Sequence, residues 1–319
     1  MLSRTADHLY WMARYTERAE NTARMLDVTF QTSLLPQSEE SAEQGWRAVL
    51  GISELQRAYD EKYPSVQAAN VIDFMVREPN NPSSIVACLT AARENARAVR
   101  GTLTTEVWET QNATWLELKN LLKSPILAQD PSNFFEWVKY RSHLSRGVGM
   151  GTMLRDEAFS FIRLGTFLER ADNTARMLDI KFHGAANSEV NDQEKATDYY
   201  YWAAILRSVS AFEVYRKVYR DVITPKRVAE LLILRSDMPR SLHACMEAVQ
   251  ANLKDLSNKS SADTERLAGK MLAELQFGRI EEVLESGLHD YLVHFFEQIF
   301  ELGNRISRDF LVPLQDGSN

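Results

Sequence analysis

A block of 16 residues occurs twice in the chain, as YTERAENTARMLDVTF at residues 15–30 and as FLERADNTARMLDIKF at residues 167–182. The two copies are identical at 11 of the 16 positions and are separated by an offset of 152 residues. Shorter matches continue downstream at slightly larger offsets: WRAVL at 46–50 with WAAIL at 202–206, and PSSIVAC at 82–88 with PRSLHAC at 239–245. Self-similarity of this kind predicts a repeated structural unit. We therefore expect a tandem internal duplication with halves at about 1–150 and 151–310.

The apolar positions of the block follow the period of a helix. At 100° per residue, Ala19, Ala23 and Leu26 share one face, and the polar residues form a stripe on the other side. The 13 glycines and 9 prolines make up about 7% of the 319 residues, against an average of about 12%. So few turn formers exclude a sandwich or barrel. We expect an all-α helical bundle with pseudo-twofold symmetry, about five helices in each half and no sheet.

The length of the chain, 319 residues, is about twice that of a usual domain. With the repeat, it predicts one doubled domain over residues 1–319, in which 311–319 form a flexible tail. The segment SRGVGMGTMLRDE (145–157) carries glycines at 147, 149 and 151. Backbone N–H groups at a helix start can hold a phosphate, but a flexible junction between the halves explains these glycines more simply. Thr224-Pro225 is a plausible helix cap and first helical position.

Composition and charge exclude several classes of protein. The net charge of −7 argues against a general binder of nucleic acid or of anionic membranes. No apolar run approaches the length that spans a bilayer, and the N-terminal residues carry charges where a signal peptide needs an apolar segment. Two cysteines cannot form a disulfide framework. We expect a soluble, cytoplasmic protein.

The repeated polar stripe is the first candidate site. Glu17, Asn21 and Arg24 are spaced i, i+4, i+7, so they stack along one helix face, and the second copy repeats the spacing with its own three residues: Glu169, Asn173 and Arg176. If the two stripes line an open cleft, the carboxylate, amide and guanidinium groups suit a zwitterionic or phosphate-bearing ligand. If they close on each other, they form an ion-pair network that locks two helices together. The sequence leaves both readings open.

The segment AARENARAVRGTLTTEVWETQN (91–112) is the second candidate. Arg93, Arg97 and Arg100 form a basic stripe at i, i+4, i+7, and Glu106, Trp108 and Asn112 follow it. The second half carries Gln250, Lys254 and Ser257 at the stripe positions. A specialised site in one half and drift on a solvated helix face both explain this asymmetry.

Signatures of a metal, a nucleophile or a cofactor are missing from the sequence. His289 and His294 lie near glutamates, but there is no HExxH or paired ExxH pattern. Cys88 and Cys245 occupy equivalent repeat positions among small and apolar residues, which is typical of buried thiols. We expect no metal and no cofactor.

The blocks LSRTADHLYWMARYTERAENTARMLDV, FIRLGTFLERADNTARMLD and ARENARAVRGTLTTEVWETQN resemble the alpha-E domain family, from Leu2 to about Phe310. This bacterial, all-helical family has no established activity. By matching position, the resemblance marks eight residues as the polar motif: Glu17, Arg18, Asn21, Arg24, Glu169, Arg170, Asn173 and Arg176. It marks six more in the central block: Arg93, Asn95, Arg97, Glu106, Trp108 and Asn112.

The resemblance also implies partners, namely a circularly permuted ATP-grasp ligase and a transglutaminase-like protein. The first hypothesis is therefore an accessory or interaction protein of a system that makes or modifies peptides, and the chain binds these enzymes or presents a peptide to them. The alternative is an enzyme or small-ligand binder whose site is the paired Glu/Asn/Arg cleft between the halves. In that case a glutamate could act as a general base while an arginine holds a carboxylate or phosphate.

Overall fold

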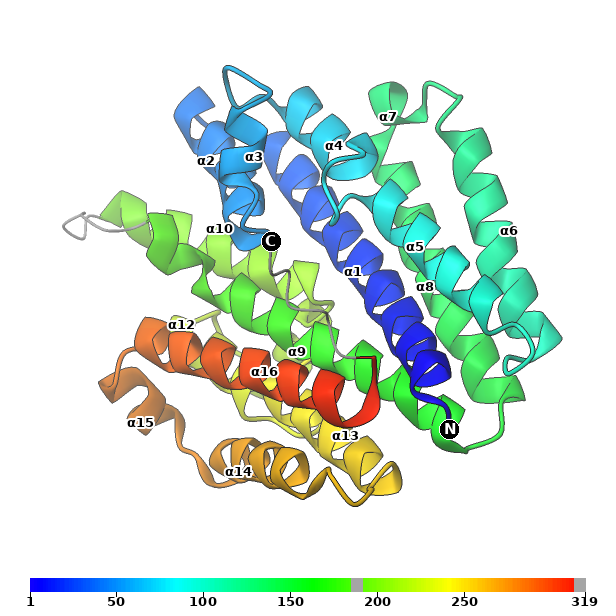
Figure 1. Cartoon of the computed structure of the whole chain (residues 1–319). Coiled ribbons are helices and arrows are strands. Elements are labelled where there is room, and N and C mark those ends of the chain that lie inside the picture. Colours follow the sequence, from blue (N-terminus) through cyan, green and yellow to red (C-terminus); the bar gives the residue numbers. More distant parts are fainter. Residues whose placement is uncertain (185–191, 313–319) are drawn as a thin grey trace.

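The fold is given by a computed structural model that describes residues 1–184 and 192–312. These residues contain sixteen helices and no strand (Figure 1), which confirms the all-α class. The first eight helices are α1 (Ser3–Ser33), α2 (Glu39–Ile52), α3 (Gln56–Asp60), α4 (Ala68–Arg77), α5 (Ile85–Ala98), α6 (Thr105–Leu121), α7 (Ile126–Gln129) and α8 (Pro131–Thr152). The next eight are α9 (Glu157–Gly184), α10 (Asp192–Ser208), α11 (Phe212–Tyr219), α12 (Pro225–Ile233), α13 (Leu242–Asp255), α14 (Ala262–Phe277), α15 (Ile280–Glu285) and α16 (Leu288–Phe310).

The expectation of about five helices per half is wrong, because the described residues hold eight before and eight after the turn at 153–156. The extra helices are short, such as α3 and α7 with five and four residues. A helix of one turn shows no periodic apolar pattern, so it cannot be recognised by periodicity. The predicted cap is confirmed, since the Thr224 side chain accepts a hydrogen bond from the backbone of Arg227 and Pro225 begins α12.

Several local features recur at positions that the sequence repeat makes equivalent. Tyr59 and Tyr215 are both fully buried, and each hydroxyl donates to a backbone carbonyl, at 3.0 and 2.8 Å. Ser84 and Ser241 both cap the helix that follows them. These features support the predicted duplication, which remains an inference from sequence.

Helices α1 and α9 cross in the middle of the molecule (Figure 1). Helix α1 packs against α5 and α8 as well as α9, and α9 packs against α13 and α16. Gly165 of α9 permits the crossing, because a Cβ atom at this position would lie 2.3 Å from the carbonyl oxygen of Tyr10. The backbones of the two central helices are therefore in direct contact here, because glycine has no side chain to separate them.

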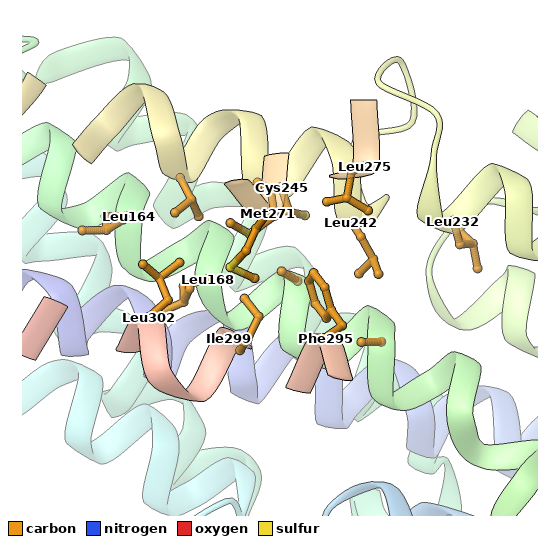
Figure 2. Packing of buried hydrophobic residues seen from close by; sticks show 14 of the residues in the cluster. Leu164, Leu168, Leu232, Leu242, Cys245, Met271, Leu275, Phe295, Ile299 and Leu302 are labelled. Atoms are coloured by element: carbon orange, nitrogen blue, oxygen red, sulfur yellow. The ribbon is translucent and has the colours of Figure 1, made fainter. Parts of the chain in front are cut away.

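Two apolar cores flank this crossing. The first is built around Trp46, Tyr59 and Phe134 of the first half. The second, part of which is shown in Figure 2, joins α9, α13, α14 and α16 through residues such as Leu168, Cys245 and Phe295. Helix α1 contributes to both cores, with Ala19, Ala23 and Leu26 in the first and Ala6, Leu9 and Tyr10 in the second.

Two further expectations need correction. Gly147, Gly149 and Gly151 lie inside α8 rather than in a flexible junction, because α8 continues to Thr152 and only residues 153–156 form the turn. The predicted tail of 311–319 begins too early, since Leu311 is buried in the second core. Residues 313–319 lie outside the described residues. Across the described part of the chain, every helix is too short or too polar to span a membrane.

Candidate functional site

The two repeated Glu-Arg dipeptides face each other where α1 and α9 cross. Arg18 donates from Nε and Nη2 to the two carboxylate oxygens of Glu169, at 2.6 and 2.9 Å. Arg170 donates from Nε and Nη2 to the two oxygens of Glu17, at 2.8 and 3.0 Å. Each dipeptide thus supplies the acid for one bidentate ion pair and the base for the other. Bidentate pairs fix geometry as well as charge.

The ion pair of Arg170 with Glu17 belongs to a larger group that we call the Arg24 cluster: Glu17, Glu20, Arg24, Arg146, Arg170 and Arg240. Glu17 accepts further hydrogen bonds from Arg146 at 2.9 Å and from Arg240 at 3.0 Å. Glu20 accepts from Arg24 at 2.8 Å and from Arg240 at 2.5 Å, and it also contacts Arg146. Helices α1, α8, α9 and the residues before α13 therefore meet at two carboxylates.

The ion pair of Arg18 with Glu169 belongs to the Arg176 cluster: Arg14, Arg18, Glu54, Glu169, Asp172 and Arg176. Arg14 donates to Glu169 at 2.7 Å and to the Tyr10 hydroxyl at 3.1 Å. Arg176 donates to Asp172 at 2.9 Å and also contacts Glu54 at the end of α2. In the repeat, Glu169 corresponds to Glu17 and Asp172 to Glu20. The Arg18–Glu169 pair is therefore the counterpart of the Arg170–Glu17 pair. The Arg176–Asp172 pair is likewise the counterpart of the Arg24–Glu20 pair.

Both glutamates of the repeated dipeptides are buried and charged. Burial acts to raise the pKa of the Glu169 carboxyl, but the ion pairs with Arg18 and Arg14 outweigh it and lower the pKa to about 2. For Glu17, burial is likewise outweighed by Arg170 and Arg240, and the pKa falls below its ordinary value. A catalytic general base needs a pKa near the working pH. Carboxylates held this far below neutrality accept hydrogen bonds and do not take up protons there.

The two stripes therefore close on each other through ion pairs. Glu17, Arg18, Glu169 and Arg170 are brought together directly, and Arg24 and Arg176 extend the two clusters along their helices. This geometry favours a structural lock between α1 and α9 over an open cleft lined by carboxylates.

The two asparagines of the stripes differ in their surroundings. Asn21 is buried, its Oδ1 accepts from Arg240 at 3.1 Å, and its Nδ2 has no hydrogen-bond partner within the described residues. Asn173, the equivalent residue of α9, is half-buried. A buried amide N–H₂ without an acceptor is costly. The surroundings of Asn21 are therefore rich in donors and short of acceptors.

Part of the second candidate region also comes together. The Arg93 guanidinium lies over the rings of Trp108 and Trp115, 5.7 and 4.6 Å from their centroids, and donates to Asn112 at 3.2 Å. Cation–π contacts of this kind stabilise an exposed site by about 0.5–1 kcal/mol. Arg93 thus joins α5 to α6, and Trp115 is a member that the sequence did not indicate.

Asn95 and Glu106 lie apart from Arg93, whereas Arg97 shares the Glu94 carboxylate with it. Asn95 faces α1, where its Oδ1 lies 2.8 Å from Nδ1 of His8. Arg97 is exposed and pairs with Glu94 one turn away at 2.7 Å. Glu106 lies exposed in the first turn of α6. The basic stripe is therefore divided between a packing contact and a solvated helix face.

Sequence reasoning placed Arg14 on the polar stripe of α1 without assigning it to the site, and it missed five other members of the two clusters: Glu20, Glu54, Arg146, Asp172 and Arg240. Glu20 and Arg14 carry a usable signal, since they lie on α1 within a turn of Glu17. Arg146 and Arg240 carry none, because they come from segments more than a hundred residues away along the chain. Only the tertiary fold brings them to Glu17.

Other chemistry finds little support in the described residues. No group of three or more histidine, cysteine or acidic side chains there is placed to hold a metal ion. Burial raises the pKa of the Cys88 and Cys245 thiols to about 12, so both are inert at neutral pH. An open cavity of about 790 Å³ lies beside α12 and α15, and none of the predicted site residues lines it.

Comparison with known proteins places the chain in a family. It matches the Alpha-E family, described as a predicted alpha-helical domain with a conserved ER motif, over residues 1–311, and it belongs to that family. An uncharacterised protein of Mycobacterium bovis is 26% identical over 314 residues, which cover 88% of this chain and 33% of the relative. An uncharacterised protein of Mycobacterium tuberculosis H37Rv is 25% identical over 314 residues, and the alignment again covers 88% of this chain and 33% of the relative. The chain spans about a third of the length of these relatives. No solved structure matches it.

The structure gives the Glu-Arg dipeptide a physical role in this chain. The dipeptide occurs at 17–18 and 169–170, and once more at 265–266. The first two copies form the reciprocal buried ion pairs of the α1–α9 crossing. In the third copy, Arg266 forms an exposed pair with Asp263 instead. The buried copies therefore join the two central helices, and the third does not.

Proposed function

We propose that the chain is an accessory protein of a peptide-forming or peptide-modifying system, and that it binds a circularly permuted ATP-grasp ligase. A transglutaminase-like protein is the second proposed partner, with a peptide as a possible shared ligand. The proposal rests on the resemblance stated above and on one observation of the structure, an exposed apolar face on α8. We place this role in the cytoplasm, with no nucleic acid or membrane involved.

The α8 face runs along the outside of the molecule at the spacing of a helix stripe and is formed by Tyr140, Leu144, Gly147 and Gly151; Leu154 lies in the turn that follows α8. Tyr140 and Leu154 are 75% and 80% exposed, and Met150 beside the stripe is also exposed. Helices normally turn such a stripe toward a core, and contiguous exposed apolar surface marks interaction sites. Gly147 and Gly151 have open space beside them, so a partner helix can approach the backbone closely.

The mycobacterial relatives add a second line of support. They are about three times as long as this chain, so an Alpha-E unit there is attached to a large amount of other protein. A domain that is joined to other protein segments in its relatives is consistent with an accessory role for this chain. The fully paired glutamates of the two clusters fit it as well, because they leave no free base for catalysis.

The test is binding of the purified ATP-grasp partner to the full chain, with Tyr140→Asp in α8 as the probe. Phe300→Asp in α16 is the matched control, since Phe300 is equally exposed at 73% on the other half. Removal of a central aromatic contact weakens an interface by about 2 kcal/mol or more. We expect calorimetry to show at least tenfold weaker binding for Tyr140→Asp and wild-type binding for Phe300→Asp. Absence of a complex at micromolar concentrations, with and without nucleotide, would count against the proposal.

A further inference from the structure

The Arg24 and Arg176 clusters differ in charge although they occupy equivalent places in the repeat. The Arg176 cluster is neutral, with three arginines and three carboxylates. The Arg24 cluster has four arginines, and the ion pairs of the described residues give them only two carboxylates, Glu17 and Glu20. It therefore carries two positive charges in excess. Unbalanced charge in a buried place is costly.

The difference can be traced to one position at the ends of α2 and α10. Glu54 follows α2 and its carboxylate contacts Arg176, whereas the equivalent Ser210 follows α10 and its hydroxyl accepts from Arg24 at 2.5 Å. Both residues adopt the same left-handed backbone, with φ of 56° and 54°. The backbone is thus alike in the two places, but one half supplies a carboxylate and the other only a hydroxyl.

The donors around Ser210 also outnumber the acceptors. His143 lies with Nδ1 2.7 Å from Arg146 Nη2 and Nε2 3.4 Å from Arg24 Nη2. Guanidinium groups only donate, and a neutral imidazole has a single acceptor nitrogen, so one of these two contacts sets donor against donor. Beside Arg240, on the buried side of the cluster, the Nδ2 group of Asn21 is a further donor without an acceptor among the described residues. Burial, together with repulsion from Arg170, lowers the pKa of Arg240 to about 10, which still leaves it charged at neutral pH.

We propose that Arg24, Arg146, His143 and Ser210 bind a phosphoryl group, which takes the place that the Glu54 carboxylate holds beside Arg176. Ser210 and His143 are exposed and the Arg146 side chain is 26% exposed, so the site can be reached from solvent. A phosphate monoester carries a charge of about −1.5 to −2 at neutral pH, which matches the excess of two. A carboxylate would balance only half of it. This inference does not depend on partner binding along α8.

The exchange of Ser210 and Glu54 between the halves provides the test. In Ser210→Glu, the chain supplies its own carboxylate to Arg24, in a backbone conformation that Glu54 already adopts. In Glu54→Ser, the neutral cluster loses its third carboxylate. Titration calorimetry of the full chain with inorganic phosphate, at constant ionic strength, measures the effect of each change.

We expect wild type to bind one phosphate and Ser210→Glu to bind it at least tenfold more weakly. Glu54→Ser leaves the Arg176 cluster with an excess of only one positive charge, so we expect it to keep a single phosphate site with wild-type affinity. His143→Gln provides an independent variant at the surface of the site and is expected to weaken phosphate binding as well. Saturable binding to wild type that Ser210→Glu does not weaken would overturn the proposal, as would absence of binding. Acetate that binds as tightly as phosphate would also overturn it.

Competition distinguishes the sources of the phosphoryl group. AMP represents a nucleotide, and O-phosphoserine represents a phosphorylated protein or peptide. Displacement of phosphate by one of them supports the proposal and identifies the class of ligand. Binding of phosphate that neither compound displaces indicates an adventitious ion only, and it overturns the proposal.

Discussion

At the scale of single residues, the glutamates of the repeated dipeptide act as buried anions. Glu169 is surrounded by Arg14 and Arg18, and Glu17 by Arg146, Arg170 and Arg240. Loss of one charge from such a group leaves arginines buried without a partner, and this costs several kcal/mol. A carboxylate of this kind contributes to stability even though it takes part in no reaction.

The depressed pKa of Glu169 predicts a defined dependence of stability on pH. Because the pKa is lower in the folded state (about 2) than its ordinary value of 4.5, the charged form stabilises the fold above about pH 4.5, and this contribution is lost as the pH falls toward 2. The shift corresponds to about 3 kcal/mol. We expect the difference in free energy of unfolding between wild type and Glu169→Gln to narrow over this range. Urea unfolding at several pH values measures it, and a difference that stays constant would contradict the assignment.

Single residues also show where prediction from sequence stops. The spacing of Glu17, Asn21 and Arg24 indicated a polar stripe. The structure places Glu17 at the α1–α9 crossing, while Asn21 contacts Arg240 and Arg24 pairs with Glu20 further along α1. Their partners Arg146 and Arg240 come from remote segments, so no local pattern could assign them. Which of the two readings of the stripe holds depends on these remote arginines, because they complete the closed network.

At the scale of helices, the close crossing of α1 and α9 depends on Gly165. Substitution by alanine would place a methyl group 2.3 Å from the Tyr10 carbonyl oxygen and force the helices apart. Overpacking of this kind costs about 1–3 kcal/mol, so we expect Gly165→Ala to lower the melting temperature. Calorimetric melting of the full chain tests this.

Gly303→Ala in α16 is the matched control. This glycine also lies inside a helix, but nothing lies within 4 Å of an added Cβ. Alanine is the better helix former by up to about 1 kcal/mol, so the variant should melt at the wild-type temperature or above. Equal destabilisation by both substitutions would show that Gly165 has no special part in the crossing.

The helices also show how tertiary packing overrides local preference. The glycines at 147, 149 and 151 predicted a flexible junction between the two halves, because glycine is a poor helix former. Helix α8 nevertheless continues through them to Thr152. Phe134, Phe135 and Val138 anchor its first turns in the first core, and Val148, which lies among the glycines, packs against the second core. The long periodic helices and the Thr224-Pro225 start were predictable for the opposite reason, because there the local signals and the packing agree.

At the scale of the whole molecule, the ion pairs connect two apolar cores. Helices α1 and α9 carry the pairs, and α1 supplies side chains to both cores. The proposed partner surface and the proposed phosphoryl site both include residues of α8, since His143 and Arg146 lie on the same helix as Tyr140 and Leu144. A ligand at the Arg24 cluster would therefore sit next to a bound partner.

The central claim is that the reciprocal Glu-Arg pairs lock α1 to α9, and a double-mutant cycle on Arg18 and Glu169 tests it most directly. The cycle compares Arg18→Met, Glu169→Gln and the double variant by urea unfolding, with Arg227 and Asp221 as a surface pair for control. Exposed pairs contribute about 0–1 kcal/mol. We expect a coupling free energy of about 1–3 kcal/mol for Arg18 and Glu169, above that of the surface pair. A coupling no larger than that of the surface pair would contradict the account.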